Sequence, residues 1–318
     1  MKASVLAVLA ALLSVNALAQ SWPAKPVRFV VPFPPGGATD VAARVVGERL
    51  TRSFGQQFVI ENRAGAVGAI GTAEVARAAA DGYTILFAAD PVTTLHLVVK
   101  NMPYDVQRDF VAVTQVTTQP LGLAVHESVP ARTVREFVAL AKANPGKFSF
   151  AHSGTGSGQH LSGELFKKLA GVEMTHVPYK GGAPAVQDLV AGQVPVAFLG
   201  STPLIPHHNA GRIRILAFTS KDRFPALPEV STLHESGFPG FDTGQWLGLL
   251  APRGTSGELV QRLYAETKKV LESAEVKERL LKAGLLAVGS TPAQFEALIR
   301  SDLERWTKLA AELGLEPQ

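Results

Sequence analysis

The chain has 318 residues, of which 46% are hydrophobic and 18% are charged, so it is long enough to bury the cores of two domains. Its formal net charge is +4, and the positive residues are scattered, which excludes the basic face typical of a nucleic-acid-binding protein. The absence of cysteine excludes disulfides, thiolate zinc sites and cysteine nucleophiles.

The first residues have the layout of a secretory signal peptide. Lys2 precedes an apolar run, Ala3–Leu13, and Ala17-Leu18-Ala19 supplies the small-residue cleavage pattern. The apolar run is too short for a permanent transmembrane helix, which needs about 20 residues. We therefore predict that residues 1–19 are removed and that the mature protein is exported and soluble.

The mature chain opens with an apolar strand, a proline-rich turn and a helix. Phe29–Val31 is the strand, Gly36-Gly37 ends the turn, and apolar residues at helical spacing over Val41–Leu50 indicate the helix. Thr39 or Asp40 is predicted to be the helix N-cap. Because the glycines lack a Cβ and a helix N-terminus has free amides, this turn is a candidate anion site. A plain tight connection is the alternative, and this stretch alone leaves both open.

Strands and helices then alternate, which predicts parallel β-α-β units. Further strands are expected at 57–63, 83–88, 111–116 and 121–125, with a helix through 73–79. The polar segment Thr117–Pro120 separates the last two strands, and we expect the chain to cross there to a second domain.

The second half repeats the strand, glycine turn and helix arrangement twice. Glycine turns are predicted at Ser153–Gly158 and at Pro178–Ala183, each followed by a helix. The strand 244–252 is expected to return the chain to the first domain. The remaining predicted strands are 148–151, 174–177, 194–199 and 214–220, and the helices are 134–143, 161–169, 184–190, 259–273, 274–283 and 292–313.

A serine hydrolase is the alternative function from another class. Ser157 lies three residues before His160 in a glycine-rich turn. The flanks lack the glycine two residues on either side of the serine that a nucleophile elbow needs. A secreted hydrolase using Ser157 and His160 therefore remains the runner-up.

Metal and nucleotide sites find less support. His207-His208 are adjacent and point in different directions, and no His-x-x-x-His pattern occurs, so we predict no metal site. Gly154-Thr155-Gly156 begins like a dinucleotide fingerprint, but Gln159 stands where the third glycine is required, and no P-loop occurs. We predict no cofactor.

Three glycine turns with flanking hydroxyl groups form a set of anion receptors without an evident nucleophile. Lys180 can pair with a ligand carboxylate, or be a solvated turn residue. Asp90 can meet an amino or hydroxyl group of a ligand, or cap a turn. Phe33 and Tyr179 can form a wall of the pocket, or belong to the core.

The chain resembles the periplasmic solute-binding receptors of the tripartite tricarboxylate transporter family, known as TctC-like or Bug receptors. The resemblance rests on motifs in the expected order over nearly the whole mature chain. These are Trp22-Pro23-x-Lys25-Pro26-Val27-Arg28, Pro32-Phe33-x-Pro35-Gly36-Gly37-x-x-Asp40, Glu61-Asn62-Arg63-x-Gly65-Ala66, Gly154-Thr155-Gly156-Ser157-x-x-His160-Leu161, Val177-Pro178-Tyr179-Lys180-Gly181, Asp188-Leu189-Val190-x-Gly192, Ala217-Phe218-Thr219-Ser220, Gly237-Phe238-Pro239-Gly240-Phe241 and Trp246-x-Gly248-Leu249-x-Ala251-Pro252.

The resemblance implies an α/β fold of the type II periplasmic-binding-protein class, with two lobes that close like a Venus flytrap. Lobe 1 would comprise residues 20–120 and 246–318, lobe 2 residues 121–245, and two crossover strands would join them. A periplasmic, monomeric protein of this kind would bind a mono- or dicarboxylic acid without catalysis. It would deliver the acid to transporter membrane subunits or to a sensor, with no nucleic-acid partner.

The ligand-binding residues expected from the turns and the resemblance lie on both lobes. They are Phe33, Pro35, Gly36, Gly37, Thr39, Asp40, Asp90, Ser153, Thr155, Gly156, Ser157, His160, Tyr179, Lys180 and Ser201. The chain departs from the family pattern at Leu199-Gly200-Ser201, where many relatives have Phe-Asp-Asn, and at Ala89–Thr93. Both departures are expected near the distal end of the ligand and leave its identity open.

Overall fold

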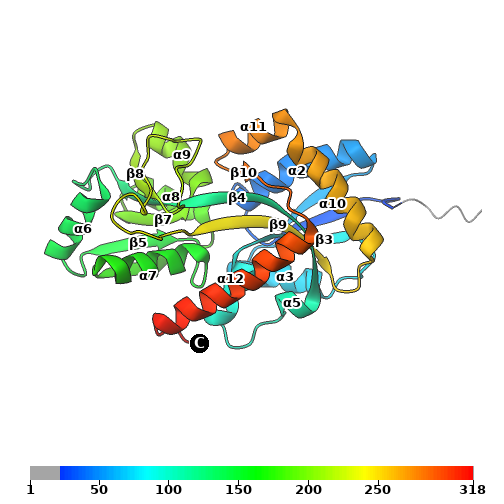
Figure 1. Cartoon of the computed structure of the whole chain (residues 1–318), viewed down its shortest axis with the longest axis horizontal. Helices are drawn as coiled ribbons and strands as arrows, with labels where there is room; N and C mark the ends of the chain where they lie inside the picture. The colour runs from blue at the N-terminus through cyan, green and yellow to red at the C-terminus, as the bar shows by residue number, and fades with distance from the viewer. Residues whose placement is uncertain (1–21, 318) are drawn as a thin grey trace, which may run out of the picture.

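The computed structural model describes residues 22–317, in which the chain forms two α/β lobes. Two long strands, β4 (Phe110–His126) and β9 (Gly244–Pro252), run through the middle of the molecule from one lobe to the other (Figure 1). The predicted two-lobed fold with two crossover strands is confirmed. The predicted signal peptide lies outside the described residues.

The sheet of the first lobe is built from parallel strands that meet the crossover pair. β1 (Val27–Val31) lies between β2 (Phe58–Asn62) and β3 (Thr84–Ala89), and both pairings are parallel, as predicted. β9 joins β3 in the antiparallel direction, and β4 joins β9. A two-residue strand, β10 (Leu286–Ala287), pairs with β4 and was not predicted.

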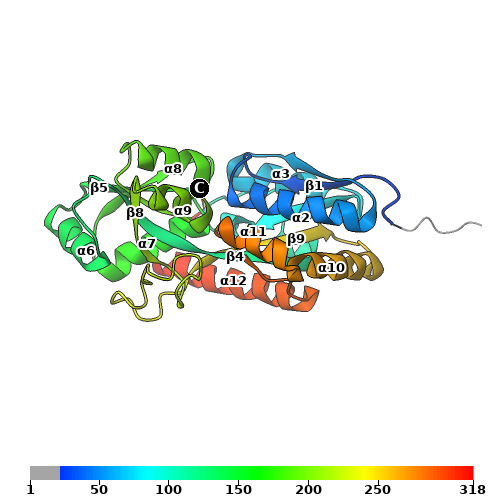
Figure 2. The same ribbon diagram turned by 90° about the horizontal axis from the view of Figure 1, so that it is seen from above.

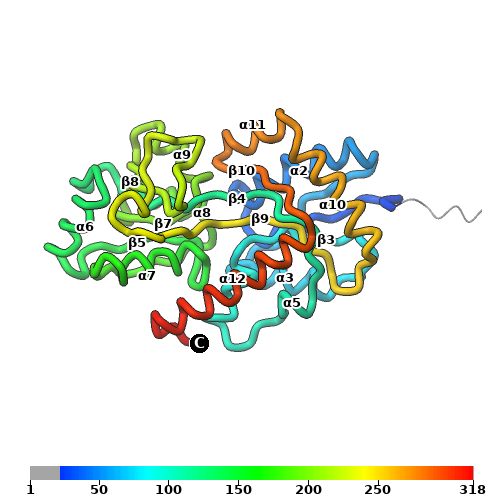
Figure 3. The backbone as a smooth tube through the Cα atoms, viewed as in Figure 1, coloured from blue at the N-terminus to red at the C-terminus, as the bar shows by residue number. Residues whose placement is uncertain are grey.

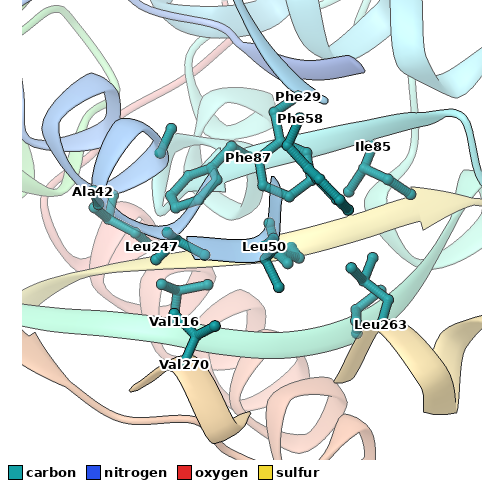
Figure 4. Close-up of a cluster of buried hydrophobic side chains, with 14 of the residues drawn as sticks. Phe29, Ala42, Leu50, Phe58, Ile85, Phe87, Val116, Leu247, Leu263 and Val270 are labelled. Carbon is teal, nitrogen blue, oxygen red and sulfur yellow. The ribbon is translucent and has the colours of Figure 1, made fainter. Parts of the chain in front are cut away.

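Helices cover this sheet on both faces, which explains why its strands are continuous apolar runs rather than alternating ones. Phe29, Phe58 and Phe87 meet Leu50 of the first helix in the main core of the lobe (Figure 4). The helices of this lobe are α2 (Ala38–Phe54), η2 (Ala66–Gly68), α3 (Ala69–Ala76), α4 (Pro91–Thr94), η3 (Leu95–Leu97), α5 (Val106–Asp109), α10 (Gly257–Glu272), α11 (Ala274–Lys282) and α12 (Pro292–Glu312).

The second lobe has its own sheet and core. β5 (Phe148–His152) lies between β6 (Met174–Pro178) and β7 (Val196–Gly200) and is parallel to both, while β7 and β8 (Ile213–Phe218) pair antiparallel with β4. Phenylalanines from β5, β7 and neighbouring helices fill the core. The helices are α6 (Val134–Ala143), α7 (Gly158–Ala170), α8 (Gly182–Val190) and α9 (Ser201–Asn209).

The crossing between lobes occurs within one continuous strand. The prediction of two strands separated at Thr117–Pro120 was wrong, because β4 continues through this segment, paired with β9 up to Pro120. From Leu121 onward β4 pairs with β7 and β8 instead. The polar residues that indicated a linker are therefore strand residues at the point where the chain changes lobes. The predicted lobe boundaries fall inside β4 and β9 and stay a prediction.

Helix α12 contacts both lobes. Phe295 packs edge-on against Trp246 in the first lobe, with ring centroids 5.1 Å apart. Near its other end, Trp306 and Ala310 join Leu161 of α7 in a small apolar cluster. Figures 1–3 show the helix passing beside the crossover strands towards α7. Among residues 22–317, no helix has the length and apolar character needed to cross a membrane.

The attachment of α12 gives a stability prediction. Phe295 is fully buried, so Phe295→Ala leaves a cavity and is expected to lower the free energy of unfolding by about 3–5 kcal/mol. The matched control is Leu169→Ala, because that side chain is 52% exposed and its truncation is expected to change stability by less than about 0.5 kcal/mol. Urea unfolding measures both; equal losses would contradict this account of the packing.

Candidate functional site

A cavity of about 40 Å³ lies between the lobes. By this measure the cavity has room for a few water molecules in the closed arrangement. The walls come from the turns that follow β1, β5, β6 and β7, and from the two crossover strands. They are formed by Phe33, Pro34, Gly37, Ala38, Thr39, Gln119, Ser153, Gln159, Lys180, Gly181, Gly182, Ala183, Pro184, Gly200, Pro203 and Gln245.

The first-lobe wall is the N-terminus of α2. Its N-cap is Gly37, and no side chain caps the helix, so its first-turn amides have no intrahelical partner. The prediction that Thr39 or Asp40 is the N-cap was wrong, since both lie within the first turn. The positive end of a 17-residue helix thus faces the cavity through Gly37, Ala38 and Thr39.

Asp40 is turned away from the cavity. Its Oδ2 accepts hydrogen bonds from the Gly36 amide and the Arg44 guanidinium, both at 3.0 Å, and its Oδ1 accepts from Asn62 at 3.0 Å. Burial alone would raise the pKa of Asp40, but these donors outweigh it and lower the pKa. Asp40 therefore stabilises the turn by hydrogen bonds on the side away from the cavity. Pro35 and Gly36 are exposed and do not line the cavity.

The second-lobe wall is the N-terminus of α8. Its N-cap is Gly181, whose φ of 116° favours glycine, and again no side chain caps the helix. Gly182 and Ala183 face the cavity at the positive end of the helix, beside the exposed ammonium group of Lys180. Tyr179 does not line the cavity: its hydroxyl donates to Asp188 Oδ2 at 2.7 Å, and burial raises its pKa to about 12.

Two glutamines on the crossover strands form the floor. Gln119 of β4 and Gln245 of β9 are paired directly across the strands, and the Gln119 amide donates to Gln245 Oε1 at 2.5 Å. Gln119 Oε1 accepts from Ser201 Oγ at 3.1 Å and from the backbone of Thr202 at 3.2 Å. Ser201 is fully buried and does not line the cavity; its hydroxyl, which has a single proton to donate, also lies 2.6 Å from the Gly284 carbonyl oxygen.

The second-lobe turn Ser153–Gly158 differs from the free anion receptor expected there. Most of its amides already have acceptors: Ser153 donates to Gln159 Oε1, Ser157 to the Gly154 carbonyl, and Gly158 to Asp90 Oδ2. Ser153 lines the cavity, as does Gln159, which was not predicted, whereas the other residues predicted in and next to this turn do not. Those others are Thr155, Gly156, Ser157 and His160.

The side chains of Ser157 and His160 each accept a hydrogen bond from a backbone amide and do not bond to each other. Ser157 Oγ accepts from the His160 amide at 3.2 Å and is the N-cap of α7. The His160 ring accepts through Nδ1 from the Gly156 amide at 3.3 Å. Among the bonds found within residues 22–317, none joins the Ser157 hydroxyl to the His160 ring.

Three histidines cluster behind this turn, with one nitrogen of each ring within 4.8 Å of the others. His152 accepts from the Gly154 amide through Nδ1, so its neutral ring holds its proton on Nε2, which faces His176 Nδ1 at 3.1 Å. A metal-binding histidine instead donates its second ring nitrogen to an acceptor. The arrangement of donors at His152 and His160 therefore favours hydrogen bonding to the turn over metal binding.

Asp90 lies at the end of β3 and does not line the cavity. Its Oδ2 accepts from the amide of Gly158, the first residue of α7, at 3.1 Å. Burial is the main cause that raises the pKa of Asp90 to about 7, and the nearby Gln245 side chain opposes this shift in part. Contact of Asp90 with a ligand stays a prediction.

Some of the ligand-binding residues predicted from the sequence do line the cavity, namely Phe33, Gly37, Thr39, Ser153 and Lys180. Other residues that line it were not predicted. The missed residues with polar side chains are Gln119, Gln159 and Gln245. A signal was present for two of them, because Gln119 and Gln245 are polar residues within the two segments expected to cross between the lobes. For Gln159 we find none.

Comparisons with known proteins agree with this geometry. The model of the tripartite tricarboxylate transporter family receptor matches residues 42–315. A protein of Pseudomonas sp. (strain P51), from the tcbD-tcbE intergenic region, is 42% identical over 93% of this chain and 88% of its own length. Protein BugT of Bordetella pertussis is 37% identical, over 93% and 91%.

Solved structures are similar as well. An R. palustris protein with adipate has a TM-score of 0.91 and 38% identity, covering 93% of this chain and all of that one (100%). MatC from Rhodopseudomonas palustris with bound malate has a TM-score of 0.85 and 31% identity, covering 91% of this chain and 100% of its own. The periplasmic binding protein BugD has a TM-score of 0.87 and 33% identity, covering 93% and 100%.

The histidine cluster predicts a pH dependence of stability. Burial is the main cause that lowers the pKa of both His152 and His160 to about 3, against about 6.5 in an unfolded chain. Below pH ~6.5 the unfolded state therefore binds more protons than the native state, and the free energy of unfolding falls as the pH falls.

The variant His160→Gln removes one of these groups. The stability difference between the original protein and this variant should narrow by about 1 kcal/mol per pH unit below pH ~6. Carboxylates titrate equally in both proteins and cancel in the difference. Chemical unfolding across this pH range is the measurement, and parallel curves would show that His160 does not stay neutral in the folded protein.

Proposed function

Since the chain belongs to the tripartite tricarboxylate transporter receptor family, we propose that it captures a small mono- or dicarboxylic acid between its lobes and delivers it to the membrane subunits of such a transporter. The family is one of solute-binding receptors, and the solved structures with adipate and with malate are similar to this chain over nearly its whole length. Export through the predicted signal peptide and a monomeric state are part of this proposal. Delivery to a sensor is the alternative partner.

The observation that carries the proposal is the positive charge presented to the cavity by two helix N-termini and one ammonium group. The uncapped N-termini of α2 and α8 face it from opposite lobes, and Lys180 is the charged side chain in its wall. Amide donors, two positive helix ends and an ammonium group are complementary to an anion with several acceptor oxygens. A carboxylate held between both helix ends would contact both lobes and so favour the closed arrangement.

The same geometry argues for binding rather than catalysis. Acyl transfer needs a nucleophile whose proton a nearby base removes. Ser157, the hydroxyl considered for that role, is 1% exposed and caps α7. His160, the base considered with it, has its Nδ1 lone pair directed to a backbone amide. We therefore place the receptor ahead of the secreted hydrolase.

A thermal-shift screen of organic acids, with adipate and malate included, tests the proposed function. An acid that binds the native state at 100 times its dissociation constant should stabilise it by about 2.7 kcal/mol and raise the melting temperature. Hydrolysis of a model ester is followed in parallel with Ser157→Ala. No shift with any acid, together with ester turnover that this substitution abolishes, would contradict the receptor function.

Gly37 offers a direct test of the α2 N-terminus. The substitution Gly37→Val places a branched side chain at the cavity wall, where the nearest atom to a new Cβ is the Pro34 carbonyl oxygen at 3.9 Å, so the fold should tolerate it. We expect loss of acid binding by at least tenfold with little loss of stability. Gly257→Val is the matched control, because Gly257 also opens a helix with open space around it but lies in α10. Titration calorimetry compares both variants; normal affinity in Gly37→Val would place the ligand elsewhere.

A further inference from the structure

The two lobes touch each other along a seam beside the ligand cavity, at the turn Ser153–Gly158. A Cβ on Gly154 would lie 2.7 Å from Cγ2 of Val67, which belongs to the first lobe. A Cβ on Gly156 would overlap Val98, also of the first lobe. The glycines of this turn thus make room for the opposite lobe, which packs directly on their backbone.

The turn is held in shape from within its own lobe. The amides of Gly154 and Gly156 donate to Nδ1 of His152 and His160, which are almost fully buried. Both glycines have positive φ angles, 138° and 83°, which favour glycine over other residues. The turn therefore presents a preformed surface to the first lobe.

The first lobe also reaches the turn with a charged group. Asp90 is 2% exposed, and its Oδ2 accepts from the amide of Gly158 across the seam. Its Oδ1 is buried and has no hydrogen-bond partner among the described residues. The N-terminus of α7 covers this carboxylate directly, since a Cβ on Gly158 would overlap Asp90 Oδ2.

We propose that Asp90 is a latch between the lobes: its carboxylate binds the first amide of α7 when the cleft closes and returns to water when the cleft opens. Asp90 then acts on ligand affinity through closure, without touching the ligand. The glycines at 154 and 156 are part of the same latch, since a Cβ at either position would overlap a valine side chain of the first lobe. This goes beyond the proposed function and applies whichever acid the cavity takes.

The latch makes closure dependent on pH. The pKa of Asp90 is about 7 in the closed arrangement, chiefly because of burial, against about 3.9 for a solvated aspartate. The closed state therefore binds more protons than the open state between these values. Closure should weaken as the pH rises towards 7 and change little above it, on the order of tenfold per pH unit below 7.

The charged and titratable groups around Asp90 do not reverse this sign. Asp302 of α12 raises the pKa of Asp90 further, while its own carboxylate accepts from Trp246 at 2.6 Å and from Arg305 at 2.8 Å. His160, in the first turn of α7, has its pKa lowered to about 3 and stays neutral over this range. Gln245 of β9 is uncharged. It lowers the pKa of Asp90, but by less than burial raises it.

The interlobe distance can be measured because the chain contains no cysteine. Spin labels are placed at Arg77→Cys, at the end of α3, and Gln187→Cys, in α8, both exposed positions on opposite lobes. Figure 2 shows α3 and α8 on the two sides of the molecule. Pulsed electron resonance then gives the closed fraction of the free protein and of the protein with adipate.

Two substitutions at Asp90 separate charge from hydrogen bonding. The parent protein should lose closed population on the order of tenfold or more between about pH 5.5 and about pH 8. Asp90→Asn keeps an oxygen that accepts from Gly158 but carries no charge, so its closed fraction should be independent of pH. Asp90→Ala leaves the amide without a partner and should be more open than the parent at about pH 5.5, where Asp90 of the parent is neutral in the closed state. Asp222→Asn, an exposed aspartate of the second lobe, is the matched control and should behave like the parent.

Gly156 provides an independent variant. Gly156→Ala should shift the labels to the open distance at every pH, because the new methyl group overlaps Val98. Gly146→Ala is matched to it, with a φ of 70° in the same lobe but open space around the new Cβ, and should close normally.

The latch is contradicted if Asp90→Asn keeps the pH dependence of the parent, or if Asp90→Ala and Gly156→Ala close as the parent does. Circular dichroism confirms that each variant is folded, and Asp90→Asn still decides if Asp90→Ala does not fold. Because the distances are also measured without ligand, failure of the acid screen would overturn the proposed function and leave this test intact.

Discussion

The antiparallel pairing of β4 with β9 is the contact on which the rest of the molecule depends. β9 joins β4 to the parallel strands of the first lobe, and β4 alone continues into the second sheet, where it pairs with β7 and β8. Gln119 and Gln245 face each other where the strands leave one lobe for the other, so the floor of the cavity lies at the crossing between the lobes. A ligand that bonds to this floor would therefore contact the strands that connect the two lobes.

Three similar turns differ in whether the first amides of the helix that follows already have hydrogen-bond acceptors. The helices α2 and α8 begin without side-chain caps and face the cavity, so their amides are available to an anion. The helix α7 begins with the Ser157 cap and the Asp90 carboxylate, so its positive end is already neutralised by the protein. The same strand–turn–helix arrangement thus presents free amides to the cavity twice and forms a contact between the lobes once.

Much of the fold followed from the sequence because hydrophobic periodicity and glycine turns are local signals. The strand 244–252 was predicted at its observed bounds, and the helix 134–143 likewise. The break expected at Thr117–Pro120 was wrong, because the pairing of β4 with β9 overrides the polar composition and the proline. The N-cap of α2 was wrong because Asp40 bonds to Gly36, Arg44 and Asn62, partners that only the folded lobe brings together.

The candidate site was predictable only in part, for a related reason. The turns that carry Gly37 and Lys180 were recognisable, since glycines before a helix indicate exposed amides. The sequence does not show which turn has its amides satisfied by side chains from elsewhere. His152 and His160 bond to the turn at Gly154 and Gly156 from within the second lobe, and Asp90 reaches Gly158 from the first.

A crystal structure of the protein with a bound organic acid tests the central claim most directly. The account predicts a carboxylate between the lobes, within hydrogen-bond distance of the first-turn amides of α2 and α8, with Asp90 still bonded to Gly158. An acid bound to the amides of Ser153–Gly158, or in the groove between α12 and the segment around Tyr104, would contradict it.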